Sequence, residues 1–207
     1  MGEVVRGFYG VVDVAAGPGA VELARWLAGE LVKGGASILQ VRVKKGGSGA
    51  LLEIARAVRA VVAGIPLVVN DRPDIALAVG AEGVHLGQDD LPLPAARNIA
   101  PGLLIGVSTH TLAQARAAAE GGADYLGFGP IYPTGTKDNP DPVVGVGQLA
   151  RVVAAVAPVP VVAIGGITPA RAREVADTGA AAACVISAVN RAADVVAAAR
   201  QVAAAFA

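Results

Sequence analysis

The chain of 207 residues has the size of one ordinary domain and lies at the short end of what a closed eight-unit α/β barrel requires. Lysine plus arginine and aspartate plus glutamate number 17 each, so no global field favours nucleic acid or anionic lipid. Residues 1–6 do not read as a signal peptide, and every apolar run is interrupted before membrane-spanning length. We expect a cytoplasmic protein that binds no membrane and no nucleic acid, with any anion site local.

Short aliphatic runs alternate with longer amphipathic stretches about eight times, which is the pattern of βα units. The expected strands are Phe8–Val14, Ser37–Val43, Leu67–Asn70, Gly83–Leu86, Leu104–Ser108, Tyr125–Gly129, Val161–Ile164 and Cys184–Ser187. The expected helices are residues 20–33, 49–63, 72–79, 92–99, 111–121, 146–157, 169–178 and 191–206. Thr111 and Thr168 are candidate N-caps, and Gly121, Gly122 and Gly179 are candidate left-handed helix ends.

Eight such units predict a (β/α)₈ TIM barrel that forms a single catalytic domain over residues 1–207. An open, doubly wound sheet is the main alternative, because local periodicity does not distinguish a closed sheet from an open one. The barrel is favoured because the polar and glycine-rich clusters follow directly after strands, where barrels assemble their sites. Cys184, the single cysteine, lies in an apolar run and is expected to be a buried thiol without a chemical role. The sequence leaves open whether the protein forms a homo-oligomer.

The second expected strand ends in charged residues on one face. Alternation along residues 40–44 places Gln40, Arg42 and Lys44 on one side and the valines between them on the other. In a barrel the polar side faces inward, toward the open end, although a solvated edge strand is the simpler alternative. A guanidinium and an ammonium two residues apart indicate a site for a diphosphate.

Aspartates follow the third and fourth expected strands. Asp71 comes directly after one strand, and Asp90 lies in the loop after the next. Each alone is more simply explained as a helix cap or a turn residue. Two carboxylates at neighbouring strand ends, beside a basic strand, are what Mg²⁺ needs when substrate phosphates and water complete its octahedron. The pair therefore predicts an Mg²⁺ site.

The loop after the sixth expected strand is long and rich in donors. Thr134, Gly135, Thr136 and Lys137 provide two hydroxyls, a close backbone approach and an ammonium. Long loops of compact barrels usually bind ligands or close over them. This segment therefore predicts a phosphate-binding loop, with a mobile surface loop as the alternative.

The last two strands are each followed by small residues. Gly166 follows the seventh strand, and Ile186 and Ser187 follow the eighth. Backbone amides at these two positions form the phosphate site that is frequent in such barrels. They predict a second phosphate site.

Three side chains near the same edge are ambiguous. Ser108 is a plausible hydroxyl donor to phosphate, but no base accompanies it as in a serine hydrolase. His85 is expected to be a hydrogen-bonded core residue, because a lone histidine on an apolar strand usually is. His110 lies closer to the open end, and neither histidine is included in the catalytic set.

Six segments in order along nearly the whole chain resemble the thiamine phosphate synthase family. They are residues 40–44 (QVRVK), 70–72 (NDR), 83–90 (GVHLGQDD), 106–110 (GVSTH), 127–137 (GFGPIYPTGTK) and 163–167 (AIGGI). The first strand and residues 45–49 depart from the family's usual pattern. The resemblance implies an Mg²⁺-dependent transferase that joins 4-amino-2-methyl-5-pyrimidinylmethyl diphosphate to 4-methyl-5-(2-phosphoethyl)thiazole, releasing thiamine phosphate and diphosphate.

The resemblance also implies roles for individual residues. Those expected to hold the pyrimidine diphosphate are Gln40, Val41, Arg42, Val43, Lys44, Asn70, Ser108 and Lys137. Those expected to hold the thiazole phosphate are Thr134, Gly135, Thr136, Gly166, Ile186 and Ser187. Asp71 and Asp90 would hold Mg²⁺, and Arg42, Lys44 and Lys137 would be the catalytic cations.

Two other functions remain open. A thiazole tautomerase of the same superfamily would need no diphosphate site, and His110 favours it because related tautomerases carry a histidine there. Asp90 and the donor-rich loop argue against it. A non-catalytic protein that binds thiamine precursors is opposed only by the completeness of the two phosphate sites and the metal pair.

Overall fold

Eight parallel strands close into a barrel in the computed structural model, which describes residues 5–135 and 142–207. The strands are β1 (Gly7–Ala15), β2 (Ala36–Lys44), β3 (Leu67–Asn70), β4 (Gly83–Leu86), β5 (Leu104–Thr109), β6 (Tyr125–Phe128), β7 (Val161–Ile164) and β8 (Ala182–Val185). Each pairs with the next in the chain, and β8 pairs with β1 through Phe8 and Ala183. This closure confirms the barrel and excludes the open sheet.

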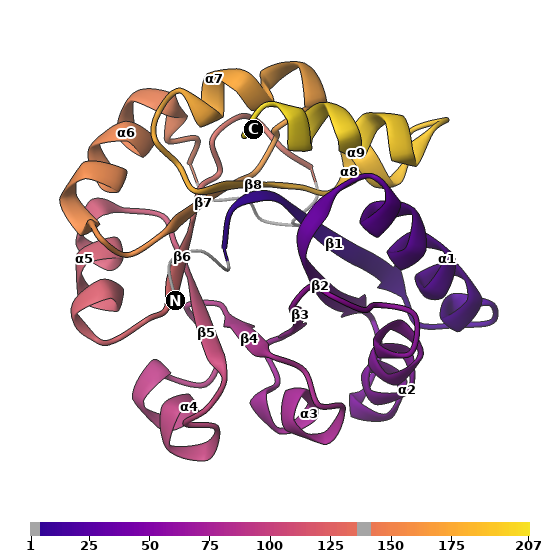
Figure 1. The fold of residues 1–207 in the computed structure, drawn as a ribbon. Helices are drawn as coiled ribbons and strands as arrows, with labels where there is room; N and C mark the ends of the chain where they lie inside the picture. Colours follow the sequence, from indigo (N-terminus) through magenta and orange to yellow (C-terminus); the bar gives the residue numbers. More distant parts are fainter. Residues whose placement is uncertain (1–4, 136–141) are drawn as a thin grey trace.

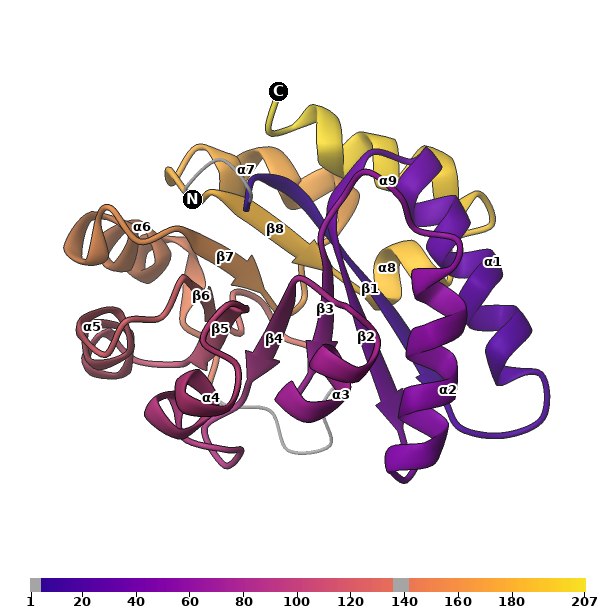
Figure 2. The ribbon, with the colours of Figure 1, turned by 60° about the horizontal axis from the view of Figure 1, so that its bottom comes forward.

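Helices surround the ring of strands on its outer side (Figure 1). They are α1 (Ala20–Lys33), α2 (Ser48–Arg59), α3 (Pro73–Ala78), α4 (Leu93–Ile99), α5 (Leu112–Glu120), α6 (Gly145–Val156), the 3₁₀ turn η1 (Pro169–Arg171), α7 (Ala172–Ala176), α8 (Ser187–Asn190) and α9 (Val195–Ala204). The strands end at a common edge, seen in the arrowheads of Figure 2, and we call this end of the barrel the mouth. No helix in the described parts is long and apolar enough to cross a membrane.

Most element boundaries match the sequence expectation within two residues. The larger differences are the end of α2 at Arg59, four residues earlier than predicted, and the start of the last helix. The eighth strand begins and ends two residues earlier than predicted, because a run of alanines shows no alternation to fix its ends. The helix expected at residues 191–206 is present as α9 but begins four residues later, at Val195, because Asp194 accepts a hydrogen bond from the Ala197 amide and caps it; the preceding turn, α8, is separate. Thr111 forms a capping box with Gln114, as expected, whereas Thr168 forms no side-chain cap.

The hydrophobic core has two layers because successive strand residues face opposite sides of the barrel wall. The outer layer lies between strands and helices and includes Phe8, Val41, Leu67 and Phe128. The inner layer fills the barrel with Val5, Tyr9, Val11, Ile38, Val68, Tyr125, Val162, Ala182 and Cys184. Burial raises the pKa of the Cys184 thiol to about 12, consistent with an inert core residue.

Two inward-facing glycines make room for rings inside this narrow barrel. A Cβ at Gly106 would overlap the ring of Tyr125. A Cβ at Gly127 would lie 3.1 Å from Cε1 of His85. The interior of the barrel therefore holds the polar side chains of His85 and Tyr125 among mainly aliphatic residues.

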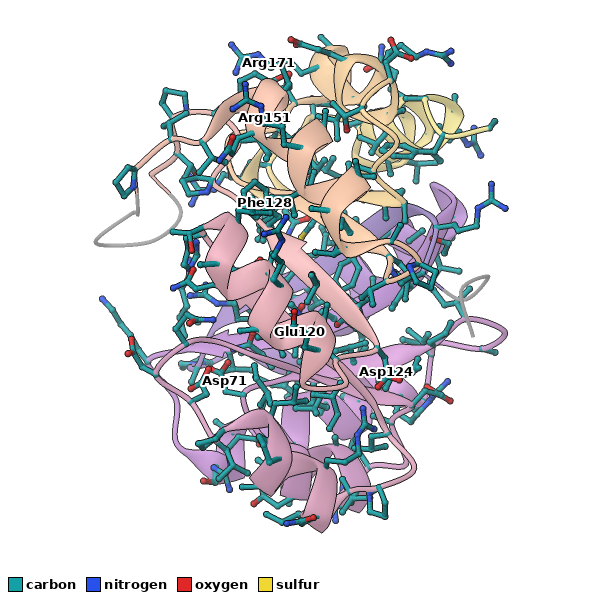
Figure 3. The ribbon with its side chains drawn as sticks, turned by 90° about the vertical axis from the view of Figure 1, so that its left-hand side faces the viewer. Asp71, Glu120, Asp124, Phe128, Arg151 and Arg171 are labelled. Carbon is teal, nitrogen blue, oxygen red and sulfur yellow. The ribbon has the colours of Figure 1, made fainter. Side chains whose placement is uncertain are left out.

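Two ion pairs lie at the end of the barrel opposite the mouth. Asp124 accepts hydrogen bonds from the Ile105 amide and from Arg97 before β6 begins. Glu82 makes the same contacts with the Leu67 amide and Arg59 before β4. Asp124 lies at the opposite end of the barrel from Asp71 in Figure 3.

Candidate active site

Two cations at the end of β2 share one carboxylate on β1. Asp13 and Arg42 are direct neighbours in the register of these strands. Nη1 of Arg42 donates to Oδ1 of Asp13 at 2.9 Å, and Nζ of Lys44 lies 3.0 Å from Oδ2. The predicted diphosphate-binding cations are therefore fixed at the mouth by a residue that the sequence did not point to.

Two carboxylates at the mouth lie close together. Asp71 adopts the left-handed conformation with φ 63°, and its amide donates to the His85 carbonyl at 2.8 Å. Burial, followed by a hydrogen bond to Asp90 and the charge of Asp90, raises the pKa of Asp71 to about 7, while Arg42 opposes the shift. Asp90 also accepts a hydrogen bond from the Gly87 amide. The strain and the raised pKa both indicate a functional pair.

The donor set fits Mg²⁺. A carboxylate pair that repels itself is stabilised when a divalent cation lies between its members, and Mg²⁺ prefers such oxygens. Within residues 5–135 and 142–207, no group of three or more acidic, histidine or cysteine side chains could hold a metal. Two carboxylates suffice for Mg²⁺, because substrate and water complete its shell in phosphate-binding sites.

A chain of hydrogen bonds crosses the barrel beneath the mouth and joins six strands. Its two ends are Ser108 and Asn70, both predicted to hold the pyrimidine diphosphate. The bonds are Ser108 Oγ to His85 Nε2 (2.9 Å), His85 Nδ1 to Tyr125 OH (3.1 Å), Tyr125 OH to Tyr9 OH (2.9 Å), Tyr9 OH to Gln40 Oε1 (2.9 Å) and Gln40 Nε2 to Asn70 Oδ1 (2.6 Å). Gln40 therefore has both ends of its amide fixed.

The direction of donation along this chain follows from its members. The hydroxyl of Tyr9 donates to Gln40, so the hydroxyl of Tyr125 must donate to Tyr9. His85 then donates from Nδ1 to Tyr125, and its Nε2 accepts from Ser108, if the ring is neutral. Burial lowers the pKa of His85 to about 4 against the opposing charge of Asp90, which makes the ring neutral near pH 7.

We expect this buried ring to weaken the protein in acid. Because the pKa of His85 falls from 6.5 in the unfolded chain to about 4 in the fold, the unfolded chain binds a proton between these pH values that the folded protein does not. The contribution of His85 to stability should thus be constant above pH 6.5 and fall by about 3 kcal/mol as the pH drops to 4. Urea unfolding at several pH values should show a shallower decline in His85→Gln, and identical slopes would contradict the assignment.

The loop after β6 lies against the loop after β7, backbone on backbone. The amides of Ile131 and Tyr132 donate to the carbonyls of Ile164 and Gly165. Gly166 has φ 65°, and a Cβ there would lie 2.5 Å from the Pro133 carbonyl oxygen. This close packing positions the segment leading to Thr134 beside the strand ends of β7 and β8.

One aromatic residue ties the same loop to the outer helices. The Tyr132 hydroxyl donates to Oε2 of Glu174 at 2.6 Å. The guanidinium of Arg171 lies over the Tyr132 ring at 4.3 Å and also donates to the Gly166 carbonyl at 3.4 Å. Tyr132 is thus held by Glu174 and Arg171, just before the segment that the sequence predicts to bind phosphate.

The remaining predicted residues fall into three groups. The side chains of Val41 and Val43 pack on the helix side of β2, so only their backbone faces the mouth region. Ile186 and Ser187 begin α8 directly after β8, beside the loop of Gly166. Thr136 and Lys137 lie outside the described residues, and Gly135 is the last residue before that gap.

Sequence reasoning missed Asp13, Tyr9 and Tyr125. For Tyr9 and Asp13 the signal was the alternation of β1, where Tyr9, Val11 and Asp13 share the inward face. Tyr125 lies on β6, a fully buried strand of four residues that shows no such alternation. His85 was expected to be a hydrogen-bonded core residue, and its two ring contacts confirm that expectation.

His110 occupies a position apart from these groups. Its Nδ1 lies 2.7 Å from the Gly129 carbonyl oxygen. It lines a hollow of about 470 Å³ together with residues at the starts of α5 and α6. The bond to Gly129 gives His110 a role in holding the end of β6.

The chain matches a family model described as thiamine monophosphate synthase over residues 8–189. It belongs to the thiamine monophosphate synthase family. A thiamine-phosphate synthase of Methanospirillum hungatei is 46% identical over 198 residues, which cover 94% of this chain and 95% of that protein. A thiamine-phosphate synthase of Anaeromyxobacter dehalogenans is 49% identical over 199 residues, which cover 95% of this chain and 87% of that protein. Membership makes the chain an enzyme of thiamine biosynthesis and a transferase.

Solved structures agree with the fold. A thiamine phosphate pyrophosphorylase from Pyrococcus furiosus superposes with a TM-score of 0.84 at 37% identity, covering 99% of this chain and 97% of that one. A 3-hexulose-6-phosphate synthase reaches a TM-score of 0.73 at 20% identity, which shows the shared barrel alone.

Proposed function

We propose that the chain joins 4-amino-2-methyl-5-pyrimidinylmethyl diphosphate to 4-methyl-5-(2-phosphoethyl)thiazole. The carbon–oxygen bond between the pyrimidine's methylene and diphosphate breaks, and a carbon–nitrogen bond to the thiazole forms. The products are thiamine phosphate and diphosphate. The observation that supports this most directly is the pairing of two cations, Arg42 and Lys44, with the close carboxylates of Asp71 and Asp90 at one mouth.

The leaving group determines what the protein must supply. Diphosphate departs with negative charge, whereas the electron-rich aminopyrimidine stabilises the cation left behind, so no covalent nucleophile is needed. Arg42 and Lys44 stabilise the departing oxygens, and Lys137, which lies outside the described residues, is proposed from the sequence as a third cation. Removing one such donor typically costs about 10²–10³ in rate.

Asp71 and Asp90 are the proposed ligands of Mg²⁺. Bound Mg²⁺ supplies positive charge beside the diphosphate oxygens. Binding of the ion would relieve the repulsion between the two carboxylates.

The pyrimidine is held by the polar chain beneath the mouth. Gln40, Asn70 and Ser108 present amide and hydroxyl groups whose orientation is set by their neighbours in that chain. The backbone of Val41 and Val43 completes this side. The Ser108 hydroxyl donates to Nε2 of the neutral His85 ring, so it must rotate to donate to a phosphate oxygen.

The thiazole phosphate is held on the other side of the mouth. Gly166, Ile186 and Ser187 follow β7 and β8, and Thr134 and Gly135 belong to the loop after β6. Thr136, outside the described residues, is proposed from the sequence as a further contact. Holding this phosphate orients the thiazole nitrogen toward the methylene carbon, so that an encounter in solution becomes a positioned attack.

The alternatives fit the geometry less well. A thiazole tautomerase would use His110, but the Nδ1 of His110 bonds to the Gly129 carbonyl. A protein that only binds precursors would not need paired carboxylates beside two cations. We also propose that residues 1–207 act as one catalytic domain in the cytoplasm, on phosphorylated small molecules, without nucleic acid, and that self-association is compatible with the activity.

The test is to incubate purified protein with both substrates and measure thiamine phosphate and diphosphate, with Mg²⁺ and after chelation. We expect equal amounts of the two products, and loss of both when the metal is removed. Bound substrates without coupled products would overturn the proposal and favour a binding protein. Isomerisation of the thiazole precursor alone would favour the tautomerase.

A further inference from the structure

Asp13 is an acidic residue in a site whose task is to bind anions. Its side chain is only 10% exposed, and both of its oxygens contact cations. Oδ1 accepts from Arg42 and Oδ2 lies 3.0 Å from Nζ of Lys44. A negative charge here weakens the attraction of the mouth for diphosphate, so its benefit must lie elsewhere.

The benefit follows from the geometry of the two cations. Arg42 and Lys44 are two residues apart on one face of β2, so their charges repel and their long side chains have many rotamers. A carboxylate that contacts both selects one arrangement before substrate arrives. Preorganised charges stabilise a leaving group better than charges that must reorganise during the reaction.

Asp13 also leaves most of the guanidinium available. Its contact with Arg42 uses Nη1. The charge of Arg42 also opposes the raised pKa of Asp71, so the guanidinium lies near that carboxylate. Arg42 thus contacts Asp13 through Nη1 and lies near Asp71, and its other N–H groups can donate to a diphosphate oxygen.

We propose that Asp13 is a positioning residue that holds Arg42 and Lys44 in the geometry of the departing diphosphate. This inference rests on the proposed function. It distinguishes placing the cations from attracting the anion, because Asp13 promotes the first and opposes the second.

The two effects separate in Asp13→Asn. Asparagine keeps the size of the side chain but accepts from only one of the two cations and carries no charge. We expect kcat to fall about 10–100-fold, since small misplacements of catalytic groups have effects of this size. The Kd for inorganic diphosphate with Mg²⁺, measured by calorimetry, should stay the same or become tighter, because the mouth has lost a negative charge.

Asp124→Asn is the matched control, because Asp124 also pairs with an arginine, Arg97, but at the closed end of the barrel. It should lower the melting temperature while leaving kcat and the diphosphate Kd unchanged. A kcat for Asp13→Asn within twofold of the unmodified protein would overturn the proposal. So would a parallel loss of kcat and diphosphate affinity, which would indicate general damage to the site.

Asp13→Glu keeps the test decisive if the asparagine variant does not fold. Glutamate retains the charge but moves the carboxylate by one methylene, so a positioning role predicts a lower kcat at unchanged diphosphate affinity. Unchanged kcat would again overturn the inference. Failure of the unmodified protein to form thiamine phosphate would instead overturn the proposed function, and the diphosphate Kd values would still report the charge effect of Asp13.

Discussion

Replacing Asp71 with asparagine is expected to lower kcat by about 10²–10³-fold and to leave the protein at least as stable as before. The activity falls because one of two carboxylates proposed to hold Mg²⁺ loses its charge. The loss should be accompanied by a higher Mg²⁺ requirement, measured by titrating the metal at saturating substrates.

The stability effect has the opposite sign for a physical reason. Burial and Asp90 raise the pKa of Asp71 to about 7, so the folded protein without metal disfavours the charged form that the unfolded chain adopts above pH 3.8. Neutral asparagine removes this cost, and it tolerates the φ of 63° well. We expect a gain of about 1 kcal/mol in metal-free protein, kept small because Asp71 is partly exposed.

Asp74→Asn is the control, because this exposed carboxylate lies three residues away and pairs with Arg72 at the surface. It should leave kcat and the Mg²⁺ requirement unchanged. A destabilised Asp71→Asn protein with full activity would contradict both the metal assignment and the repulsion between the two carboxylates.

The barrel was predictable from the sequence because its strands are short aliphatic runs followed by polar clusters. The sequence pointed to Arg42, Asp71 and Gly166 for the same reason: each lies within two residues of the end of a strand, and parallel strands bring such ends to one edge. Alternation also separated Arg42 from its valine neighbours. These are local patterns along the chain, and the closed sheet brings the residues that carry them close together in space.

Contacts across the barrel were not predictable in this way. Tyr9 and Tyr125 are 116 residues apart, and their hydroxyls meet only because β1 and β6 face each other across the interior. Space for Tyr125 depends on the missing side chain of Gly106. Asp13 lies on the inward face of β1, but its two partners depend on the β1–β2 register. The run of alanines before Cys184 likewise gave no period from which to place β8.

The glycine after β7 gives the second large expected effect. Replacing Gly166 with alanine should lower kcat/KM for the thiazole phosphate by about 10²-fold or more, as expected when a binding loop is displaced. A Cβ there would lie 2.5 Å from the Pro133 carbonyl oxygen and 2.6 Å from that of Tyr132, and φ is 65°. Because both obstacles are backbone, the loop that leads to Thr134 must move.

The kinetic pattern identifies the cause of that loss. The KM for the thiazole phosphate should rise, while the Kd of the pyrimidine diphosphate should change little, because β2 and β3 lie on the other side of the mouth. Gly147→Ala is the matched control, since Gly147 is exposed in α6 and a Cβ there meets nothing within 4 Å. It should keep full activity and gain slightly in stability, because alanine favours a helix more than glycine does. Equal losses for both substrates in Gly166→Ala would instead mean that the barrel itself, rather than the loop, is disturbed.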